Sequence, residues 1–183
     1  MRETTADLEA LQALLDRSIE GAGAFLRSSF QMPEHSLSAG QLAGHLDGSL
    51  TVALATTTAR GEPRVAPISA LFVRARFCVP SVAQAARSRH LAQRPAASLT
   101  YFEGNDLAVI AHGQVAIVPD GDSAFDELDA LQVASGNESV RGWSGDGVYL
   151  RLEPTTLFTF ARDPARYDAV SARAHRPGPA SPR

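Results

Sequence analysis

Apolar side chains recur at helical spacing near the start of the chain, from Thr5 to Phe30. Acidic and basic residues lie between them, so one face of a helix would be apolar and the other polar. The apolar positions are Leu8, Leu11, Leu15, Ala22, Phe25 and Leu26. We therefore expect an amphipathic helix over this range, weakened at Gly21 and Gly23.

A second helix is indicated by a start signal. Ser38 and Gln41 have the spacing of a capping box, and Leu37 and Leu42 occupy the two positions of a hydrophobic staple. We expect a short helix over residues 39–47.

After Gly48 the pattern changes to a period of two residues, which is typical of strands. The expected strands cover residues 50–58, 64–72, 76–79, 97–102, 107–118, 148–152 and 156–160, with helices over 82–94 and after Asp122. Most neighbouring strands are joined by hairpin-length links, whereas a doubly wound parallel sheet would need a crossover helix after every strand. The order therefore predicts a mainly β fold with flanking helices, in which an antiparallel sheet curls into a barrel.

The second expected strand contains Pro67, which has no backbone N–H to donate. Such a residue is restricted to the edge of a sheet or to a bulge. We therefore expect Pro67 to lie outside the middle of a regular ladder.

Length and composition indicate one domain. The chain has 183 residues, of which 44% are hydrophobic, and this is enough for one core. We expect residues 1–47 to form helices that pack on the barrel and residues 48–162 to form the barrel. Residues 163–183 are expected to be a disordered tail, because Pro, Ala and Arg dominate there without periodicity.

The composition predicts a cytoplasmic protein without membrane or nucleic-acid partners. Cys78 is the single cysteine, and the first residues lack the features of a secretory signal. No apolar run approaches the roughly 20 residues that span a bilayer. The net charge is −3, so there is no excess of positive charge for nucleic-acid binding. Lysine is absent, and the arginines that supply all basic side chains present forks suited to carboxylate and phosphate.

Several classes of active site are disfavoured by residue spacing. The five histidines are scattered without partners at ligand spacing, so no metal site is predicted. Residues 142–145 come near a nucleophile elbow, but the register is wrong and no strand precedes them. The chain also lacks a Walker loop and a Gly-rich dinucleotide motif after a strand.

The segment from Pro80 to Pro95 carries the strongest signal for ligand binding. A strand end there leads into a helix whose first two turns hold Arg87 and Arg89, beside His90. The N–H groups at a helix start and one or two guanidinium forks can hold a phosphate. A solvated helix face with ordinary surface arginines is the alternative that spacing alone leaves open.

Several stretches, taken in order, resemble a known family. They are VALATTTARGEPRVAPISALF, FCVPS and ARSRHLAQRPAASLTYFEGNDLAVIAHGQVAIV, while VYLRLEPTTLFTF is similar to the family's closing strands. From Leu50 to Val118 the set resembles the flavin-binding core of the pyridoxamine 5'-phosphate oxidase-like proteins. The resemblance implies an antiparallel split β-barrel of the Greek-key, FMN-binding type.

The same resemblance implies a set of cofactor-binding residues. They are Arg64, Val65, Ala66, Pro67, Ile68 and Ser69 on the second strand, Val79, Pro80 and Ser81 at the end of the third, and Arg87 and Arg89 on the following helix. The second-strand residues would border the isoalloxazine ring and ribityl chain, and the arginines would bind the phosphate, with Arg87 as the principal anchor. Two positions differ from the founding enzymes, because Ala86 replaces an arginine and Ser69 replaces a lysine.

The function implied is that of an FMN-dependent oxidoreductase with a small-molecule substrate, and no residue is nominated as catalytic acid or base. The alternatives are a reductase that uses the deazaflavin coenzyme F420, and a flavin or haem binding or sensing protein without turnover, with His112 or His90 as possible haem ligands. The resemblance also implies a homodimer with the cofactor at its interface, which Trp143 and Tyr149 would reach from the partner subunit. His112 is expected either near the flavin or as a satisfied barrel histidine.

Overall fold

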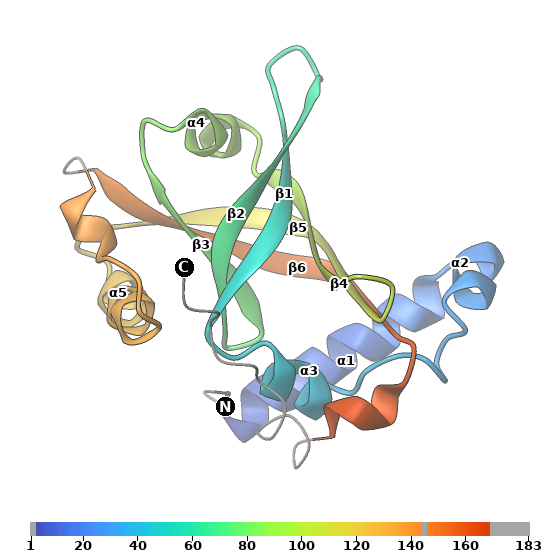
Figure 1. Ribbon diagram of the computed structural model, residues 1–183. Coiled ribbons are helices and arrows are strands. Elements are labelled where there is room, and N and C mark those ends of the chain that lie inside the picture. The colour runs from blue at the N-terminus through green and yellow to red at the C-terminus, as the bar shows by residue number, and fades with distance from the viewer. Residues whose placement is uncertain (1–2, 144–145, 169–183) are drawn as a thin grey trace, which may run out of the picture.

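The computed structural model describes residues 3–143 and 146–168, in which long strands form a barrel with helices around it (Figure 1). The helices are α1 (Thr5–Gly21), α2 (Ala24–Ser29), α3 (Ala39–His45), α4 (Ala86–Gln93) and α5 (Ser123–Ala134). The strands are β1 (Ser49–Thr57), β2 (Pro63–Val73), β3 (Arg76–Val82), β4 (Ala96–Glu103), β5 (Leu107–Pro119) and β6 (Gly147–Ala161). Two 3-10 helices also occur, η1 (Val140–Gly142) and η2 (Pro164–Tyr167).

The six strands form one closed barrel in the order β1-β2-β3-β6-β5-β4. All neighbouring strands in it are antiparallel. The predicted fold class, a mainly β protein with flanking helices around an antiparallel barrel, is therefore confirmed.

The last two expected strands are one strand, β6, which continues across Glu153 and Pro154. The register with β5 shifts at this point, because His112 pairs with Thr156 and Gly113 with Pro154, so β6 has one extra residue, Thr155. A side chain at position 113 would place its Cβ 2.1 Å from the carbonyl oxygen of Glu153. Gly113 thus allows the two strands to approach closely, and β6 passes the proline without leaving the barrel.

The expected N-terminal helix is divided into α1 and α2, with the break at Ala22 and Gly23. This is where the glycines were expected to weaken it. The start of α3 has the expected capping box, in which Gln41 N donates to Ser38 Oγ over 3.3 Å and Ser38 N donates to the Gln41 side chain over 2.8 Å.

The third strand is longer than expected, and the helix after it starts later. Ser81 and Val82 remain in β3 because they pair with Val148 and Gly147 of β6. A turn closed by a 3.0 Å hydrogen bond from Ala85 N to Val82 O then leads into α4. The strand end and the helix are therefore separated by three residues, 83–85.

Two clusters of buried side chains hold the fold together. The larger one fills the barrel and extends to α1 and α3, where Leu11, Leu15 and Leu42 are buried. The smaller one lies on the outer surface of β3 and β6, where Phe125 and Leu128 of α5 pack. Figure 1 shows α5 on one side of the barrel and the N-terminal helices across one end.

The described chain continues past the barrel to residue 168, so the expected disorder does not begin at 163. Residues 164–167 form η2, and Tyr167 is buried with its ring 4.8 Å from that of His45. The rest of the expected tail, residues 169–183, lies outside the described residues. In the described part of the chain, no helix has the length and apolar character needed to cross a membrane.

Candidate functional site

The hairpin of β1 and β2 leaves one strand edge open. β2 pairs with β1 along most of its length, from Pro63 to Leu71, but with β3 only from Leu71 to Val73. Within the described residues, the second edge of β2 is therefore unpaired over its first part. Pro67 lies in this part, as expected for a residue that cannot donate to a ladder.

A cavity of about 420 Å³ lies between this hairpin and α4. Figure 1 shows the hairpin extending past the barrel at the end where α4 lies. The cavity is lined by Leu54, Thr56 and Thr58 of the first strand and its turn, by Arg64, Val65, Ala66 and Ile68 of β2, and by Ala86, Arg87 and His90 of α4. Its volume falls in the range of small-molecule and cofactor sites, roughly 300–1,000 Å³.

Cross-strand pairing explains how the hairpin builds its wall. Thr56 lies opposite Arg64 and Leu54 lies opposite Ala66 in the register of β1 and β2. Paired residues share one face of a sheet, and the next position along each strand on that face is two residues away. The wall therefore changes from polar, near the turn, to apolar, nearer the barrel.

Two arginines line the cavity, and no Asp or Glu is among its described lining residues. Arg87 is half-buried, and its Nη1 lies 3.4 Å from Ser81 Oγ. Arg64 comes from the opposite wall, where its Nη2 is 2.7 Å from a carboxylate oxygen of Glu62 in the turn. The arrangement favours an anionic group between β2 and α4.

Ser81 and Ser88 hold the helix against the end of β3. Their hydroxyl oxygens are 3.0 Å apart, and Ser88 Oγ donates to Val82 O over 2.8 Å. Both side chains are buried. This contact fixes the first turn of α4 and with it the direction of Arg87.

His90 is the second polar side chain that α4 contributes to the cavity, after Arg87. Its Nδ1 lies 3.2 Å from Thr56 Oγ1, so the side chain links the helix to β1 across the cavity wall. The sequence indicated His90 as a neighbour of the arginines and as a possible haem ligand, but it gave no sign that Thr56 and Thr58 would line the same cavity.

The structure gathers five of the expected cofactor-binding residues around the cavity and places the others elsewhere. Those that line it are Arg64, Val65, Ala66, Ile68 and Arg87. Pro67 and Ser69 are exposed on β2, while Val79 and Pro80 are buried where β3 pairs with β6. Ser81 contacts Arg87 instead of lining the cavity, and Arg89 donates from Nη1 to Gln84 O over 2.7 Å.

Arg89 therefore does not join Arg87 at the cavity as a second arginine that could bind a phosphate. Residues two apart on a helix differ in direction by about 200°, so Arg87 and Arg89 cannot face one cavity. Residues three apart share a face, and this is why His90 joins Arg87. The helical period alone could have predicted that His90, and not Arg89, shares a face with Arg87. The second arginine at the cavity is Arg64, from β2.

Tyr149 is fully buried, so the expectation that it reaches a neighbouring subunit is wrong. Its hydroxyl donates to Asp129 over 3.2 Å, and burial together with the charge of that carboxylate raises the pKa of Tyr149 above its ordinary value. Trp143 packs partly buried against the cluster under α5. His112 is exposed on the barrel's outside, 2.7 Å from Ser98 Oγ, and does not line the cavity.

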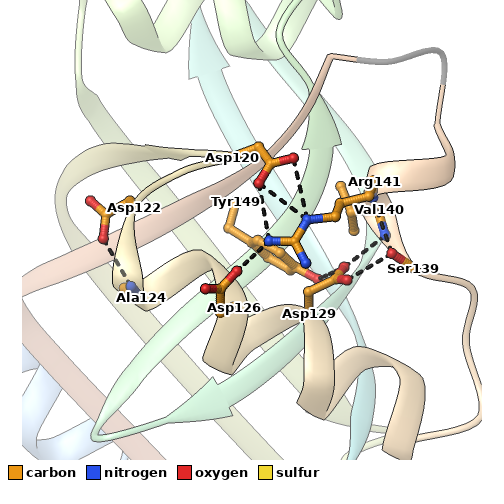
Figure 2. Close-up of polar contacts among 9 residues, drawn as sticks. All are labelled: Asp120, Asp122, Ala124, Asp126, Asp129, Ser139, Val140, Arg141 and Tyr149. Atoms are coloured by element: carbon orange, nitrogen blue, oxygen red, sulfur yellow. Dashed lines mark hydrogen bonds and ion pairs between the residues drawn. The ribbon is translucent and has the colours of Figure 1, made fainter.

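Asp129 connects α5, η1 and β6 (Figure 2). Besides the Tyr149 hydroxyl, its buried carboxylate accepts hydrogen bonds from Ser139 Oγ over 2.7 Å and from Val140 N over 2.8 Å. Figure 2 also shows Arg141 of η1 directed toward Asp120 and Asp126, with both of which it forms ion pairs.

The segment after η1 supports the loop that leads into α4. Ala83 N donates to Asp146 O over 2.9 Å, and Gln84 Nε2 donates to the Asp146 carboxylate over 2.8 Å. Because Gln84 O in turn accepts from Arg89, the loop before the helix is held from both sides. Within the described residues, no group of three His, Cys, Asp or Glu side chains is placed to bind a metal ion.

A family model described as pyridoxamine 5'-phosphate oxidase matches residues 40–161. No curated protein matches the chain at a significant level. Among solved structures, an F420 reductase is 21% identical, with a TM-score of 0.51 over 62% of this chain and 92% of that one. A conserved hypothetical protein from Mycobacterium tuberculosis is 15% identical, with a TM-score of 0.57 over 75% and 90%. A FAD-binding protein from Mesorhizobium loti is 18% identical, with a TM-score of 0.52 over 68% and 93%. At these identities the likeness shows the fold.

Proposed function

Because the chain belongs to the pyridoxamine 5'-phosphate oxidase family, which its residues 40–161 match, we propose that it is a flavin-dependent oxidoreductase whose cavity binds FMN. The observation that carries the proposal is the pair Arg64 and Arg87, which line one cavity with no Asp or Glu among its described lining residues. Glu62, the ion-pair partner of Arg64, lies in the turn. Guanidinium forks match the geometry of phosphate and carboxylate groups, and FMN carries a phosphate.

The residues of the cavity suit the separate parts of such a cofactor. Arg87 and Arg64 would hold the phosphate, and the hydroxyls of Thr56 and Thr58 would accept or donate hydrogen bonds beside it. Leu54 and Ile68 would contact the ring system through apolar surface. The flavin supplies hydride transfer when it is bound, and the chain supplies binding, orientation and charge.

The deazaflavin coenzyme F420 is the second cofactor that the site would suit. It is supported by the structural likeness to an F420 reductase, although that likeness by itself concerns the fold. F420 also carries a phosphate, so the pair of arginines does not distinguish it from FMN.

A binding or sensing role without turnover is the alternative outside the enzymes. For haem, His90 is the histidine that lines the cavity, whereas His112 lies on the outer surface beside Ser98. The contact of His90 with Thr56 uses Nδ1 and leaves its other ring nitrogen as the possible ligand atom.

We further propose that the protein is a homodimer. The unpaired edge of β2 and the exposed Val65 beside the cavity are features that a second copy would cover. A cofactor held next to Val65 would then lie close to the subunit interface.

Absorption spectroscopy and binding titrations test the proposed cofactor. We expect purified protein to carry, or to bind after addition, FMN with the spectrum of an oxidised flavin. Binding of F420 with its single violet band, and not of FMN, would support the deazaflavin alternative. Failure to bind either cofactor would contradict both.

Measurement of turnover distinguishes an enzyme from a protein that only binds or senses the cofactor. With cofactor bound, we expect steady consumption of NAD(P)H or reduced F420 in the presence of one or more members of a panel of quinones, enones and tetrapyrroles. Cofactor binding with no consumption across the panel would favour the non-catalytic role.

A further inference from the structure

One polar side chain of the cavity can change its charge near neutral pH. His90 lines the cavity together with Arg64 and Arg87. An arginine stays protonated throughout the pH range in which proteins fold, whereas histidines ordinarily titrate near about pH 6.5. Among the described lining residues, His90 is therefore the side chain whose charge can follow the pH of the surroundings.

The ring of His90 is held from the wall of the cavity. Its Nδ1 lies 3.2 Å from the hydroxyl oxygen of Thr56, which is only 4% exposed. Arg87 precedes His90 by three positions on α4, so the two side chains share a face of the helix. Because Nδ1 contacts Thr56, Nε2 is the ring nitrogen that remains for a ligand next to Arg87.

A hydroxyl partner lets His90 change its charge without losing this hydrogen bond. The Thr56 hydroxyl can donate to Nδ1 of a neutral ring, or accept from the N–H of a protonated ring. In both cases Nε2 carries a hydrogen, because a neutral ring that accepts at Nδ1 has its proton on Nε2. His90 can therefore donate from Nε2 to an anion in either charge state, and more strongly when it is protonated.

The charged side chains around His90 are mostly cationic. Arg87 shares its face of α4, and Arg64 lies on the opposite wall of the cavity, on β2. At the end of α4, Arg94 Nε donates to the carbonyl oxygen of Thr57 over 3.3 Å. Glu62, in the turn, is the ion-pair partner of Arg64 and is not among the described lining residues.

The other strands next to α4 add no carboxylate. β1 has no charged residue, and the titratable residue of β5 is His112, which is exposed on the outer surface beside Ser98. Among the described lining residues, none therefore offers a negative charge to a protonated His90. A phosphate in the cavity would supply that charge and favour the protonated ring.

We propose that His90 is a third phosphate ligand of the cavity, and that its protonation makes FMN binding depend on pH. The proposal rests on the FMN site proposed above and adds the residue that regulates it. Nε2 would donate to the phosphate beside Arg87, while Thr56 holds the ring from the wall. FMN is then bound more tightly when His90 is charged, so binding weakens as the pH rises. By linkage, FMN binding must also take up protons.

A suitable pH range separates His90 from the other titrating groups. A phosphate monoester loses its second proton near about pH 6, so that it is a dianion at higher pH. The arginines keep their charge, and burial raises the pKa of Cys78 to about 12. Between about pH 7 and pH 9, His90 is therefore the group that titrates among the described lining residues.

Calorimetric titrations of the full chain in buffers without phosphate test the proposal. From about pH 7 to about pH 9, we expect the Kd for FMN to rise roughly tenfold. Riboflavin has the same ring system without the phosphate, and its Kd should change far less. Titrations in two buffers with different ionisation enthalpies count the protons, and we expect uptake of a fraction of one proton with FMN and none with riboflavin.

Two matched variants assign the effect to this histidine. His90→Gln keeps a neutral N–H donor on the side chain but cannot become charged, so we expect FMN binding without proton uptake and with little change in Kd between the two pH values. His112→Gln is the same substitution at a residue that does not line the cavity, and it should keep the pH dependence of the wild type. Riboflavin titration and circular dichroism of each variant show whether the cavity and the fold are intact.

The outcomes separate the role of His90 from the choice of cofactor. A wild-type chain that binds FMN with the same Kd at both pH values, relative to riboflavin, would overturn the role of His90 and leave the FMN site standing. Equal pH dependence in His90→Gln and the wild type would also overturn it, because another group would then be titrating. A chain that does not bind FMN would overturn the proposed cofactor and the role of His90 together.

Discussion

At the scale of single residues, the two arginines of α4 have different environments although they are two positions apart. Arg87 is half-buried beside Ser81 and lines the cavity, whereas Arg89 is exposed and occupied by the carbonyl of Gln84. The difference follows from the helical period. Arg87 is therefore the arginine of this helix that is available to a ligand, and Arg64 meets it from the hairpin.

The single cysteine should be inert while the protein is folded. Burial raises the pKa of the Cys78 thiol from 9.0 to about 12, so the reactive thiolate is scarce at neutral pH. We expect Ellman's reagent to label Cys78 slowly in native protein and rapidly in denaturant. Rapid native labelling would show that β3 opens easily.

The same shift has a consequence for stability at alkaline pH. The pKa of Cys78 is higher in the folded than in the unfolded chain. The contribution of the neutral thiol to the free energy of unfolding is therefore complete below pH 9.0 and is lost as the pH rises toward about 12.

At the scale of elements, the site depends on how α4 is held. Ser81 and Ser88 fix the helix to β3, and Asp146 supports the loop before it. The segment that carries Asp146 is in turn tied to α5 through Asp129. The cavity wall is therefore supported by a polar network outside the barrel core.

Asp129→Asn tests this network. The amide has one acceptor oxygen where the carboxylate has two, so it leaves part of the donor set of Ser139, Val140 and Tyr149 unsatisfied in a buried place. We expect the free energy of unfolding to fall by about 2 kcal/mol, and the Tm to fall by roughly 4–8 °C in a protein of this size.

The control for that substitution is Asp126→Asn. Asp126 is an exposed partner of Arg141, and such surface ion pairs contribute about 0–1 kcal/mol. Equal decreases of Tm in the two variants would show that the buried hydrogen bonds of Asp129 stabilise the fold no more than a surface ion pair does.

At the scale of the whole molecule, the barrel positions the hairpin and α4, while the ends of the chain pack around it. η2 lies on α3, where Gln41 Nε2 donates to Pro164 O over 3.1 Å and Tyr167 is buried. The C-terminal part of the described chain is therefore part of the folded domain and not only a tail.

Two truncations test where the folded domain ends. A chain that ends at residue 168 keeps Tyr167 and its contacts, so we expect an unchanged Tm. A chain that ends at residue 162 loses them, and we expect its free energy of unfolding to fall by about 2 kcal/mol, the amount typical of one large buried side chain. Differential scanning calorimetry compares the two. Equal Tm values would mean that η2 contributes nothing, and a loss already at 168 would mean that the removed residues pack on the domain.

Local patterns predicted much of this fold, because period-two segments and hairpin-length links leave few arrangements other than an antiparallel barrel. They failed where a contact distant in the sequence decides the outcome. β6 continues across Pro154 because Gly113 lies opposite, and β3 reaches Val82 because β6 pairs with it. In the site, the family resemblance indicated Arg64, and the helix start together with the resemblance indicated Arg87, but the face of α4 that meets the cavity depends on where the helix begins.

Calorimetric titration with FMN and with riboflavin tests directly whether Arg87 binds the phosphate of the cofactor. We expect Arg87→Ala to weaken FMN binding by roughly ten- to a hundredfold, since a charge-assisted hydrogen bond contributes about 1.5–3 kcal/mol. Riboflavin, which lacks the phosphate, should be affected far less, and Arg89→Ala should leave FMN binding nearly unchanged. Equal weakening of FMN and riboflavin binding by Arg87→Ala would contradict phosphate binding by Arg87, because the side chain would then shape the cavity without holding the phosphate.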